Sequence, residues 1–199
     1  MKRVVFLILC LGMVSIAKSE GKKELQTAVF GAGCFWCVEA VFQEVKGVYS
    51  VESGYAGGTY VNPTYQEVTT GKTGHAEVAR ISYDASVVSY ETLLAIFFQT
   101  HDPTTLNYQG ADRGTQYRSA IFYVNDFQKE TAVRIIFALN KEKAYPHPIV
   151  TEVTPLGVFY VAENYHQNYY KNNSEQGYCT YVIQPKMEKF RKVFKDKLK

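Results

Sequence analysis

Apolar residues recur along this chain with the spacings that regular secondary structure requires. Between residues 35 and 46 they stand at positions i, i+3, i+4 and i+7, as Val38, Val41, Phe42 and Val45. This spacing places the four side chains on one face of a helix, so it predicts a helix over 35–46 that packs against a core. Gly47 follows it and is typical of a residue that ends a helix.

Similar patterns predict three more helices. Ser89 has a side chain suited to capping a helix N-terminus. The helix after it would bury Leu93, Leu94, Phe97 and Phe98. Another helix is predicted over 126–141. The last, amphipathic helix carries a single apolar stripe of Met187, Phe190, Phe194 and Leu198.

Strands and loops fill the intervals between these helices. Short apolar or alternating runs predict strands over 27–30, 76–84, 119–124 and 149–154. Two long stretches, 53–75 and 101–117, read as shaped loops, and loops of this length in a compact domain are usually functional. The alternation of strands and helices indicates one layered α/β or α+β sandwich, and 199 residues suit a single domain.

The first nineteen residues resemble a targeting segment. Lys2 and Arg3 precede an apolar run from Val4 to Ile16, and Ala17-Lys18-Ser19 offers small residues where a signal peptidase cuts. The run is too short for a comfortable membrane span. We therefore expect export to the periplasm or the cell exterior after cleavage behind Ser19. An uncleaved signal that anchors the protein to the membrane is the alternative.

Removing this segment also removes the net charge. The chain has 22 basic and 19 acidic residues, and three of the basic ones, Lys2, Arg3 and Lys18, lie in the first nineteen positions. The remaining chain therefore has 19 basic and 19 acidic residues. This balance argues against nucleic acid as a partner.

Cysteine usage points to thiol chemistry. Three cysteines remain beyond the signal segment, Cys34, Cys37 and Cys179. An odd number in an exported protein argues against a purely structural disulfide framework. The four scattered histidines add no zinc-like spacing to the single CxxC, so no metal is expected.

Cys34 lies between a predicted strand and a predicted helix. At the start of a helix, free amide groups and the helix dipole favour the reactive thiolate. The alternative is a buried, inert cysteine, which is the commonest state of a free thiol. In the strand over 76–84, Glu77 shares a face with Ala79 and Ile81, the expected core face. A carboxyl group there would have a raised pKa, unless it reaches solvent at the strand end.

A set of short motifs runs in order through the chain. They are Gly33-Cys34-Phe35-Trp36, Gly-Tyr-Ala-Gly-Gly at 54–58, Asn62-Pro63-Thr64-Tyr65, Gly74-His75-Ala76-Glu77, Asp-Arg-Gly-Thr-Gln-Tyr-Arg-Ser at 112–119, Glu-Asn-Tyr-His-Gln at 163–167 and Gly177-Tyr178-Cys179. Together they resemble the peptide methionine sulfoxide reductase A family over roughly 27–185. A lone CxxC would be weak, whereas this ordered set is specific.

The resemblance implies the roles of the residues nearest the thiol. Cys34 would attack the sulfoxide sulfur, and Phe35 and Trp36 would form the apolar pocket for the methyl group. Glu77 would give its proton to the sulfoxide oxygen, which is a poor leaving group until it is protonated.

Three more residues receive roles from the same resemblance. Tyr65 and Tyr117 would donate hydrogen bonds to the sulfoxide oxygen and stabilise the charge that develops there. Asp112 would help to order the pocket. The resemblance also implies reduction of the S epimer, because each epimer of methionine sulfoxide has its own enzyme.

The attack would leave Cys34 as a sulfenic acid, which a second thiol resolves to a disulfide. Cys179 matches the family's recycling position, in a polar stretch that we expect to be a mobile tail, and Cys37 is the alternative. The chain departs from the common family pattern twice. Cys37 stands where glycine is frequent, and the glycine-rich tail with a further cysteine is missing.

The resemblance further implies the architecture and partners. We expect an α+β fold, a single-domain two-layer α/β sandwich with a ferredoxin-like core, long functional loops and a C-terminal tail. The expected divisions are a signal peptide over 1–19, a short leader over 20–26 and the catalytic domain over 27–199. Substrates would be oxidised proteins and free methionine sulfoxide. The reductant would be thioredoxin-like, the protein a monomer, and no cofactor is expected.

Two other functions fit parts of the pattern. A thioredoxin-type disulfide oxidoreductase could use Cys34 and Cys37, but it would leave Glu77 and the glycine-rich loops without a role. A non-catalytic peptide-binding module could use a tyrosine-lined groove, since the chain has 16 tyrosines. A disulfide-exchange assay without sulfoxide tests the disulfide oxidoreductase alternative. Turnover of a sulfoxide with dithiothreitol distinguishes a reductase from the peptide-binding module.

Overall fold

The computed structural model describes residues 24–199. The predicted signal segment over 1–19 therefore lies outside the described residues. Within 24–199, no helix is both long enough and apolar enough to cross a membrane.

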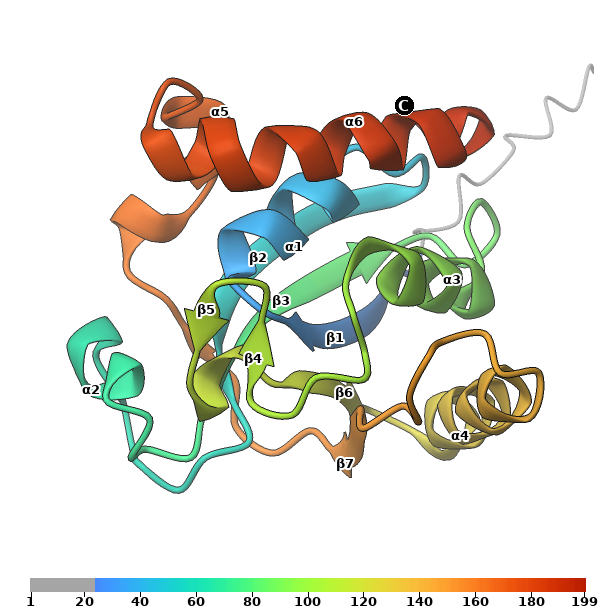
Figure 1. The fold of residues 1–199 in the computed structure, drawn as a ribbon, viewed down its shortest axis with the longest axis horizontal. Coiled ribbons are helices and arrows are strands. Elements are labelled where there is room, and N and C mark those ends of the chain that lie inside the picture. The colour runs from blue at the N-terminus through green and yellow to red at the C-terminus, as the bar shows by residue number, and fades with distance from the viewer. Residues whose placement is uncertain (1–23) are drawn as a thin grey trace, which may run out of the picture.

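A six-stranded sheet lies at the centre of the molecule (Figure 1). Its strand order is β7-β6-β1-β3-β2-β8, and every neighbouring pair is antiparallel except β6 and β7. The strands are β1 (Gln26–Ala32), β2 (Val48–Ala56), β3 (Ala76–Tyr83), β6 (Ser119–Tyr123), β7 (Glu152–Pro155) and β8 (Tyr160–Val161). A separate two-stranded hairpin consists of β4 (Tyr108–Gln109) and β5 (Asp112–Arg113).

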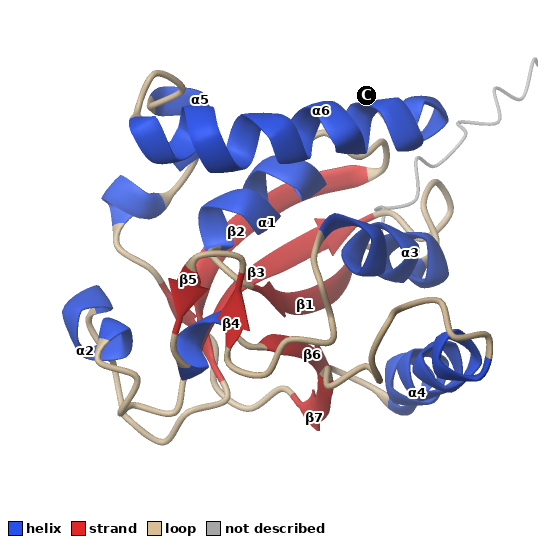
Figure 2. Cartoon of the chain, in the orientation of Figure 1, coloured by secondary structure: helices blue, strands red, loops and turns tan. Residues whose placement is uncertain are grey.

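Helices of very different lengths surround the sheet (Figure 2). The longer ones are α1 (Phe35–Gln43), α3 (Tyr90–Thr100), α4 (Asp126–Lys141) and α6 (Gln184–Val193). Two short helices, α2 (Tyr65–Thr69) and α5 (Tyr169–Asn172), stand in the connections. Single turns complete the list: η1 (Thr115–Tyr117), η2 (Asn164–His166), η3 (Cys179–Ile183) and η4 (Lys195–Lys197).

The core lies between one face of the sheet and the helices. In β1, Phe30 points to this face and packs its ring against Phe42 of α1 and Phe97 of α3, with ring centroids 5.6 and 5.0 Å apart. Its neighbour Val29 points the opposite way, into a smaller apolar cluster that the Leu156 side chain covers. Alternation along one strand thus separates the two faces, as strand geometry requires.

The chain path confirms the predicted fold class. Its core runs β1-α1-β2-β3-α3-β6, and these four strands lie in the order β6-β1-β3-β2. This βαββαβ path with two helices on one face is the ferredoxin-like, two-layer arrangement that we expected. The connection from β1 to α1 and the strand β3 matter most for the site, because Cys34 caps the N-terminus of α1 and Glu77 lies in β3.

Most predicted helices form close to their predicted bounds. Helix α4 spans the predicted residues 126–141, and Ser89 caps α3 by accepting a hydrogen bond from the Thr92 backbone N–H. Helix α1 ends at Gln43, earlier than predicted, because Val45 leaves the helix and pairs with Leu198 in a β-bridge. Strand β7 begins at Glu152, later than the predicted start at 149.

Strand β2 was missed, and the predicted loop over 53–75 was therefore too long. Residues 53–56 belong to β2, and helix α2 lies within the remainder. The strand is hard to recognise from sequence because Ser53 and Gly54 interrupt the alternation of apolar residues, although both are buried in the structure. Gly54 is needed where it stands, since an added Cβ would lie 2.3 Å from the Phe159 ring. Sequence periodicity cannot reveal such a close approach.

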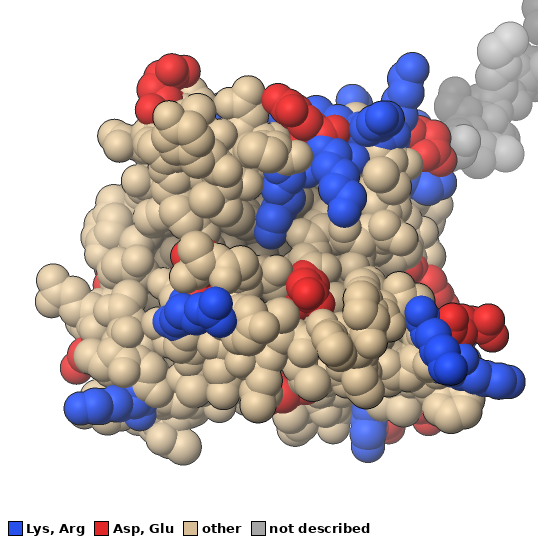
Figure 3. Space-filling model, viewed as in Figure 1, with Lys and Arg blue, Asp and Glu red and all other residues tan. Residues whose placement is uncertain are grey.

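Charges of both signs are spread over the face of the molecule in Figure 3. The densest group of Lys and Arg on this face lies over α6. Within α6, the Arg191 guanidinium contacts both carboxylate oxygens of Glu44, the C-cap residue of α1. This pair ties α6 to α1.

Candidate active site

Cys34 is the cap residue at the N-terminus of α1, as predicted. The chain turns into the helix at Gly33, whose φ of +88° lies in the left-handed region that favours glycine. A Cβ at Gly33 would also lie 2.7 Å from the Gln109 side chain. A glycine before Cys34 thus allows the strand-to-helix turn and lets the β4–β5 hairpin approach the thiol.

Glu77 lies on the helix-facing side of β3, as its alternation predicted. Its side chain is buried, with 1% of the residue exposed, so the strand-end alternative in which it reaches solvent is wrong. The Phe35 backbone N–H donates a 3.0 Å hydrogen bond to Oε2 of Glu77. Burial raises the pKa of Glu77 to about 8, although this hydrogen bond opposes the shift. Near neutral pH the carboxyl group therefore holds a proton beside Cys34.

The resting state of Cys34 differs from the sequence prediction. Burial raises the pKa of Cys34 well above its ordinary value, and the hydrogen bond with Cys37 and the charge of Glu77 raise it further. The hydrogen bond from Cys34 lowers the pKa of Cys37 to about 7. The two thiols are in contact and titrate as a pair. The helix-start argument alone missed this pairing, since it considered Cys34 without its neighbour.

Tyr65 and Tyr117 lie in the same apolar enclosure. Tyr65 begins α2 and stacks on Phe35, with ring centroids 6.3 Å apart and the planes 17° apart. Burial raises the pKa of Tyr65 to about 12, with smaller contributions from Glu77 and Cys34. Burial and Glu77 also raise the pKa of Tyr117, which ends η1. Both hydroxyls therefore remain protonated donors, and ionisation of Glu77 or Cys34 would raise the pKa of each further.

A third tyrosine, Tyr178, also reaches this site. In the sequence it was noted only as part of the Gly177-Tyr178-Cys179 motif and was given no role. The Tyr178 hydroxyl donates a 2.6 Å hydrogen bond to Oδ2 of Asp112, and it lies beside both thiols, where it lowers the pKa of Cys34 and of Cys37. Asp112 thus anchors a side chain that covers the thiol pair. Its place in the Gly-Tyr-Cys motif was the available signal, but the contact joins residues 66 positions apart.

Phe35 and Trp36 form an aromatic wall beside Cys34. Phe35 is fully buried, and Trp36 stacks face to face on Tyr169, with centroids 3.7 Å apart and planes within 7°. The indole Nε1–H of Trp36 donates a 3.1 Å hydrogen bond to Nδ1 of His166. Burial lowers the pKa of His166, which keeps Nδ1 available as an acceptor. The Trp36 indole is therefore held on its face by the Tyr169 ring and at its Nε1 edge by His166.

Cys179 does not occupy the mobile, loop-like tail that the sequence suggested. It begins η3, a π-helical turn that continues directly into α6, and none of its surface is exposed. The polar residues at 172–177 precede this turn rather than contain the thiol. Cys179 nevertheless belongs to the same buried apolar core as Cys34 and Cys37. Burial raises the pKa of Cys179, and the charge of Cys37 adds to the shift. Its role in resolution stays a prediction.

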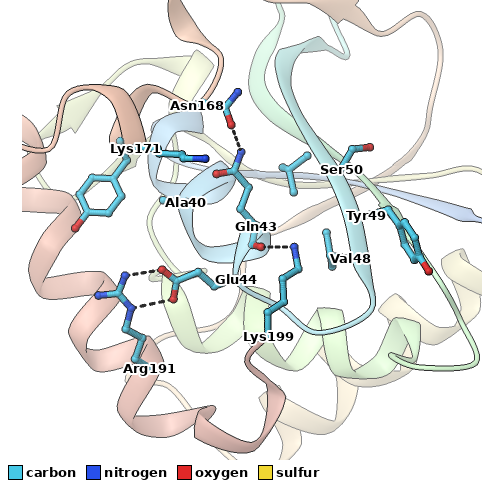
Figure 4. A pocket seen from close by; sticks show the side chains of 12 residues that line it. Ala40, Gln43, Glu44, Val48, Tyr49, Ser50, Asn168, Lys171, Arg191 and Lys199 are labelled. Atoms are coloured by element: carbon cyan, nitrogen blue, oxygen red, sulfur yellow. Dashed lines mark hydrogen bonds and ion pairs between the residues drawn. The ribbon is translucent and has the colours of Figure 1, made fainter.

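The candidate residues do not line the groove drawn in Figure 4. That groove has a volume of about 620 Å³ and lies beside the outer face of α1, where Gln43 and Glu44 meet Asn168, Arg191 and Lys199. Within 24–199, no group of three or more His, Cys, Asp or Glu side chains could hold a metal ion.

The buried site around Cys34 thus combines four chemical elements. They are a nucleophilic thiol, a protonated carboxyl group, hydroxyl donors and an apolar aromatic wall.

Several known proteins are similar to this chain in sequence and in fold. The family model described as peptide methionine sulfoxide reductase matches residues 26–198. The peptide methionine sulfoxide reductase MsrA of Deinococcus radiodurans is 55% identical over 174 residues, which are 87% of this chain and 84% of that protein.

Two solved structures are also similar. Methionine sulfoxide reductase A of Corynebacterium diphtheriae is 37% identical, with a TM-score of 0.75 over 81% of this chain and 80% of that one. Mxr1 from Saccharomyces cerevisiae in reduced form is 32% identical, with a TM-score of 0.71 over 78% of this chain and 90% of that one. The chain belongs to the peptide methionine sulfoxide reductase family.

Proposed function

We propose that this reductase converts methionine-S-sulfoxide, free or within oxidised proteins, to methionine, with Cys34 as nucleophile and Glu77 as proton donor. The observation that carries the assignment is the buried Glu77 carboxyl group, whose pKa is raised to about 8 and whose oxygen meets the Phe35 N–H. A neutral acid beside a buried thiol is the combination that sulfoxide reduction needs, because the oxygen leaves only once it is protonated.

The proposed first step transfers oxygen from the substrate to Cys34. The Cys34 sulfur attacks the sulfoxide sulfur while Glu77 protonates the oxygen. The attack forms a sulfur–sulfur bond. As that bond and the sulfur–oxygen bond of the substrate break, the hydroxyl group moves to the Cys34 sulfur, so methionine leaves and Cys34 becomes a sulfenic acid. The proton of Cys34 has a nearby acceptor in Cys37, to which it is hydrogen-bonded. Cys34 can therefore become a thiolate at the moment of attack despite its raised pKa.

The other residues would position the substrate. Tyr65 and Tyr117 donate to the sulfoxide oxygen, and Asp112 orders the pocket through Tyr178. Phe35 and Trp36 receive the methyl group on a dry aromatic surface. The experiment that tests the whole assignment is reduction of each sulfoxide epimer with dithiothreitol. Turnover of the S epimer alone supports it, and no turnover of either epimer contradicts it.

Completion of the cycle needs an external dithiol. We infer a thioredoxin-like reductant, because a disulfide between two buried cysteines is returned to thiols by thiol–disulfide exchange. The yeast protein Mxr1 has been crystallised in complex with Trx2. We also propose that the protein acts as a monomer, since Cys34, Glu77 and both tyrosines come from one chain.

The resolving thiol is the part of the cycle on which sequence and geometry differ. The motif match favours Cys179, whereas Cys37 is already hydrogen-bonded to Cys34. Cys179 is fully buried in a helical turn rather than carried on a free tail. A CxxC whose first cysteine begins a helix closes readily. We therefore propose that Cys37 forms the first disulfide.

We expect Cys37→Ser to yield one methionine per enzyme and then to stop as the Cys34 sulfenic acid. Cys179→Ser should still form the Cys34–Cys37 disulfide, which mass spectrometry after one equivalent of sulfoxide would map. A stall in Cys179→Ser alone would assign resolution to Cys179, as the motif predicts. Stalling of both variants would indicate a relay that passes the disulfide from one pair to the next.

Export is a separate proposal that rests on residues 1–19. We expect the mature protein to begin at Glu20, because the small residues Ala17 and Ser19 stand where a signal peptidase recognises its substrate. N-terminal sequencing of the protein from cell fractions tests this directly. A chain that begins at Met1 in the cytosolic fraction would refute both export and cleavage, and the same N-terminus in the membrane fraction would indicate an uncleaved anchor.

A further inference from the structure

Residues 163–169 form a strap that crosses the open face of α1, and we use this name for that segment below. Along α1, Trp36, Glu39 and Gln43 recur at helical spacing and so share one face. Each of the three contacts the strap. Trp36 meets His166 and Tyr169, Glu39 meets Asn168 and Tyr169, and Gln43 meets Asn168. The strap therefore follows this face of the helix that begins at Cys34.

The strap is also fixed from the opposite side, by strand β2. The Gln167 side chain accepts a 3.0 Å hydrogen bond from the Ser53 N–H and donates to the Ser53 and Ala162 carbonyls. The Glu163 carboxylate accepts from the Tyr55 hydroxyl and from the Tyr65 N–H, each at 2.8 Å. Only at residues 168 and 169 does the strap depend on α1 for its backbone hydrogen bonds.

Glu39 supplies those hydrogen bonds from a buried position. Its Oε1 accepts from the Asn168 N–H at 2.9 Å and its Oε2 accepts from the Tyr169 N–H at 3.3 Å. Only 1% of Glu39 is exposed, and burying a carboxylate is costly unless it is hydrogen-bonded. Asn168 has a φ of +55°, so the chain turns in a left-handed conformation where Glu39 holds it. None of this is needed for the reaction at Cys34 itself.

The consequence of the turn is the position of Tyr169. Directly after Asn168, the Tyr169 ring lies flat on Trp36 at 3.7 Å. Trp36 in turn follows Cys34 by two residues and faces the substrate methyl group in the proposed mechanism. The Glu39 carboxylate lies one turn along α1 from Trp36. It is linked to this wall of the substrate pocket through its hydrogen bond from the Tyr169 backbone N–H and through the stacking of the Tyr169 ring on Trp36.

We propose that Glu39 is a positioning residue for the methyl pocket, because its carboxylate fixes the strap turn that stacks Tyr169 on Trp36. This inference rests on the proposed role of Trp36 in binding the substrate methyl group. Glu39 touches neither the substrate nor the reacting atoms. Its loss should therefore weaken substrate binding while the chemical step at Cys34 persists.

Figure 4 shows the outer side of the same region and supplies a matched control. There Gln43 donates a 2.9 Å hydrogen bond from its amide to Asn168, and Glu44 pairs with Arg191 of α6. Glu44 is the C-cap residue of the same helix and has the same side chain as Glu39, but its carboxylate pairs with Arg191 of α6 and not with the strap. Glu44→Gln thus removes a charge from the end of α1 while it leaves the turn at Asn168 intact.

The test uses the single tryptophan as its reporter, because Trp36 is the one Trp in the sequence. In Glu39→Gln, one carboxylate oxygen becomes an amide donor that faces a backbone N–H. We expect KM for the sulfoxide to rise about tenfold, the effect of leaving roughly one buried backbone N–H without an acceptor, with kcat within about twofold. Trp36 fluorescence should shift as the stack loosens. Glu44→Gln should leave KM and emission at wild-type values.

Tyr169→Leu and the double variant test the route of the effect. Tyr169→Leu removes the stacked ring but not the carboxylate, so it should raise KM and shift Trp36 emission even if Glu39→Gln fails to fold. If Glu39 acts through Tyr169, the double variant should have a KM no higher than Tyr169→Leu alone. Independent, multiplying effects would overturn the proposal, as would unchanged KM and emission in either single variant.

Failure of the proposed function would look different. A wild-type enzyme that reduces no sulfoxide would refute the reductase assignment, but the emission spectra of the wild type and its four variants would still report whether Glu39 sets the Trp36 stack. Conversely, normal wild-type turnover with unshifted KM and emission in Glu39→Gln would refute the positioning role alone.

Discussion

The Cys34→Ser variant is expected to lose sulfoxide reduction, by about 10⁴-fold or more, while it remains folded. The covalent route depends on the Cys34 sulfur, and a serine hydroxyl is too weakly nucleophilic and too weakly acidic to replace it. Cys34 is 7% exposed, and serine is close to cysteine in size, so the enclosure should tolerate the change. Methionine formed in a single turnover, without reductant, measures the step directly.

The matched control for this variant is Cys37→Ser, which alters the neighbouring thiol in the same helix. It should still form one methionine per enzyme, because resolution follows the first oxygen transfer, although more slowly, because Cys37 also accepts the Cys34 proton in the proposed mechanism. Near-normal methionine production by Cys34→Ser would contradict the mechanism and would make Cys37 the nucleophile. Trp36 emission and the free energy of unfolding show whether each variant keeps the native fold.

The sequence predicted those parts of the molecule where one periodic pattern decides the outcome. Helix α4 and the face on which Glu77 lies followed from spacing alone, since a helix repeats after 3.6 residues and a strand after two. Strand β2 could not be predicted in this way. Gly54 is there because the Phe159 ring approaches it from a distant part of the chain, and periodicity contains no such information.

The candidate site shows the same division between local and distant effects. A helix start marks Cys34 as a candidate nucleophile, but its protonation depends on Cys37, Glu77 and burial together. The Tyr178 contact with Asp112 and the burial of Cys179 depend on how the C-terminal segment returns over α1. Residues far apart in sequence make these contacts, so a motif can name the participants without giving their arrangement.

Glu77→Gln is expected to slow sulfoxide reduction by about 10²- to 10⁴-fold, which is the usual contribution of a general acid. Glutamine keeps the size of the side chain, and its amide oxygen can still accept from the Phe35 N–H, but it has no proton to give to the sulfoxide oxygen. Alkylation of Cys34 should continue in the variant, which separates loss of the acid from loss of the thiol. An unchanged rate would assign protonation to Tyr65 or Tyr117.

The pH dependence identifies the acid more sharply than the rate alone. Because the pKa of Glu77 is about 8 and the reaction needs its protonated form, wild-type activity should fall as pH rises through about 8. The fall should disappear in Glu77→Gln. Stability should follow the same group, since the folded-state pKa is raised from 4.5 to about 8. The wild-type free energy of unfolding should therefore decrease as pH rises from about 4.5 to about 8, and the decrease should be smaller in Glu77→Gln, where Glu39, whose pKa burial raises to about 7, still contributes. A high-pH loss of activity that is identical in both proteins would mean that another group supplies the proton.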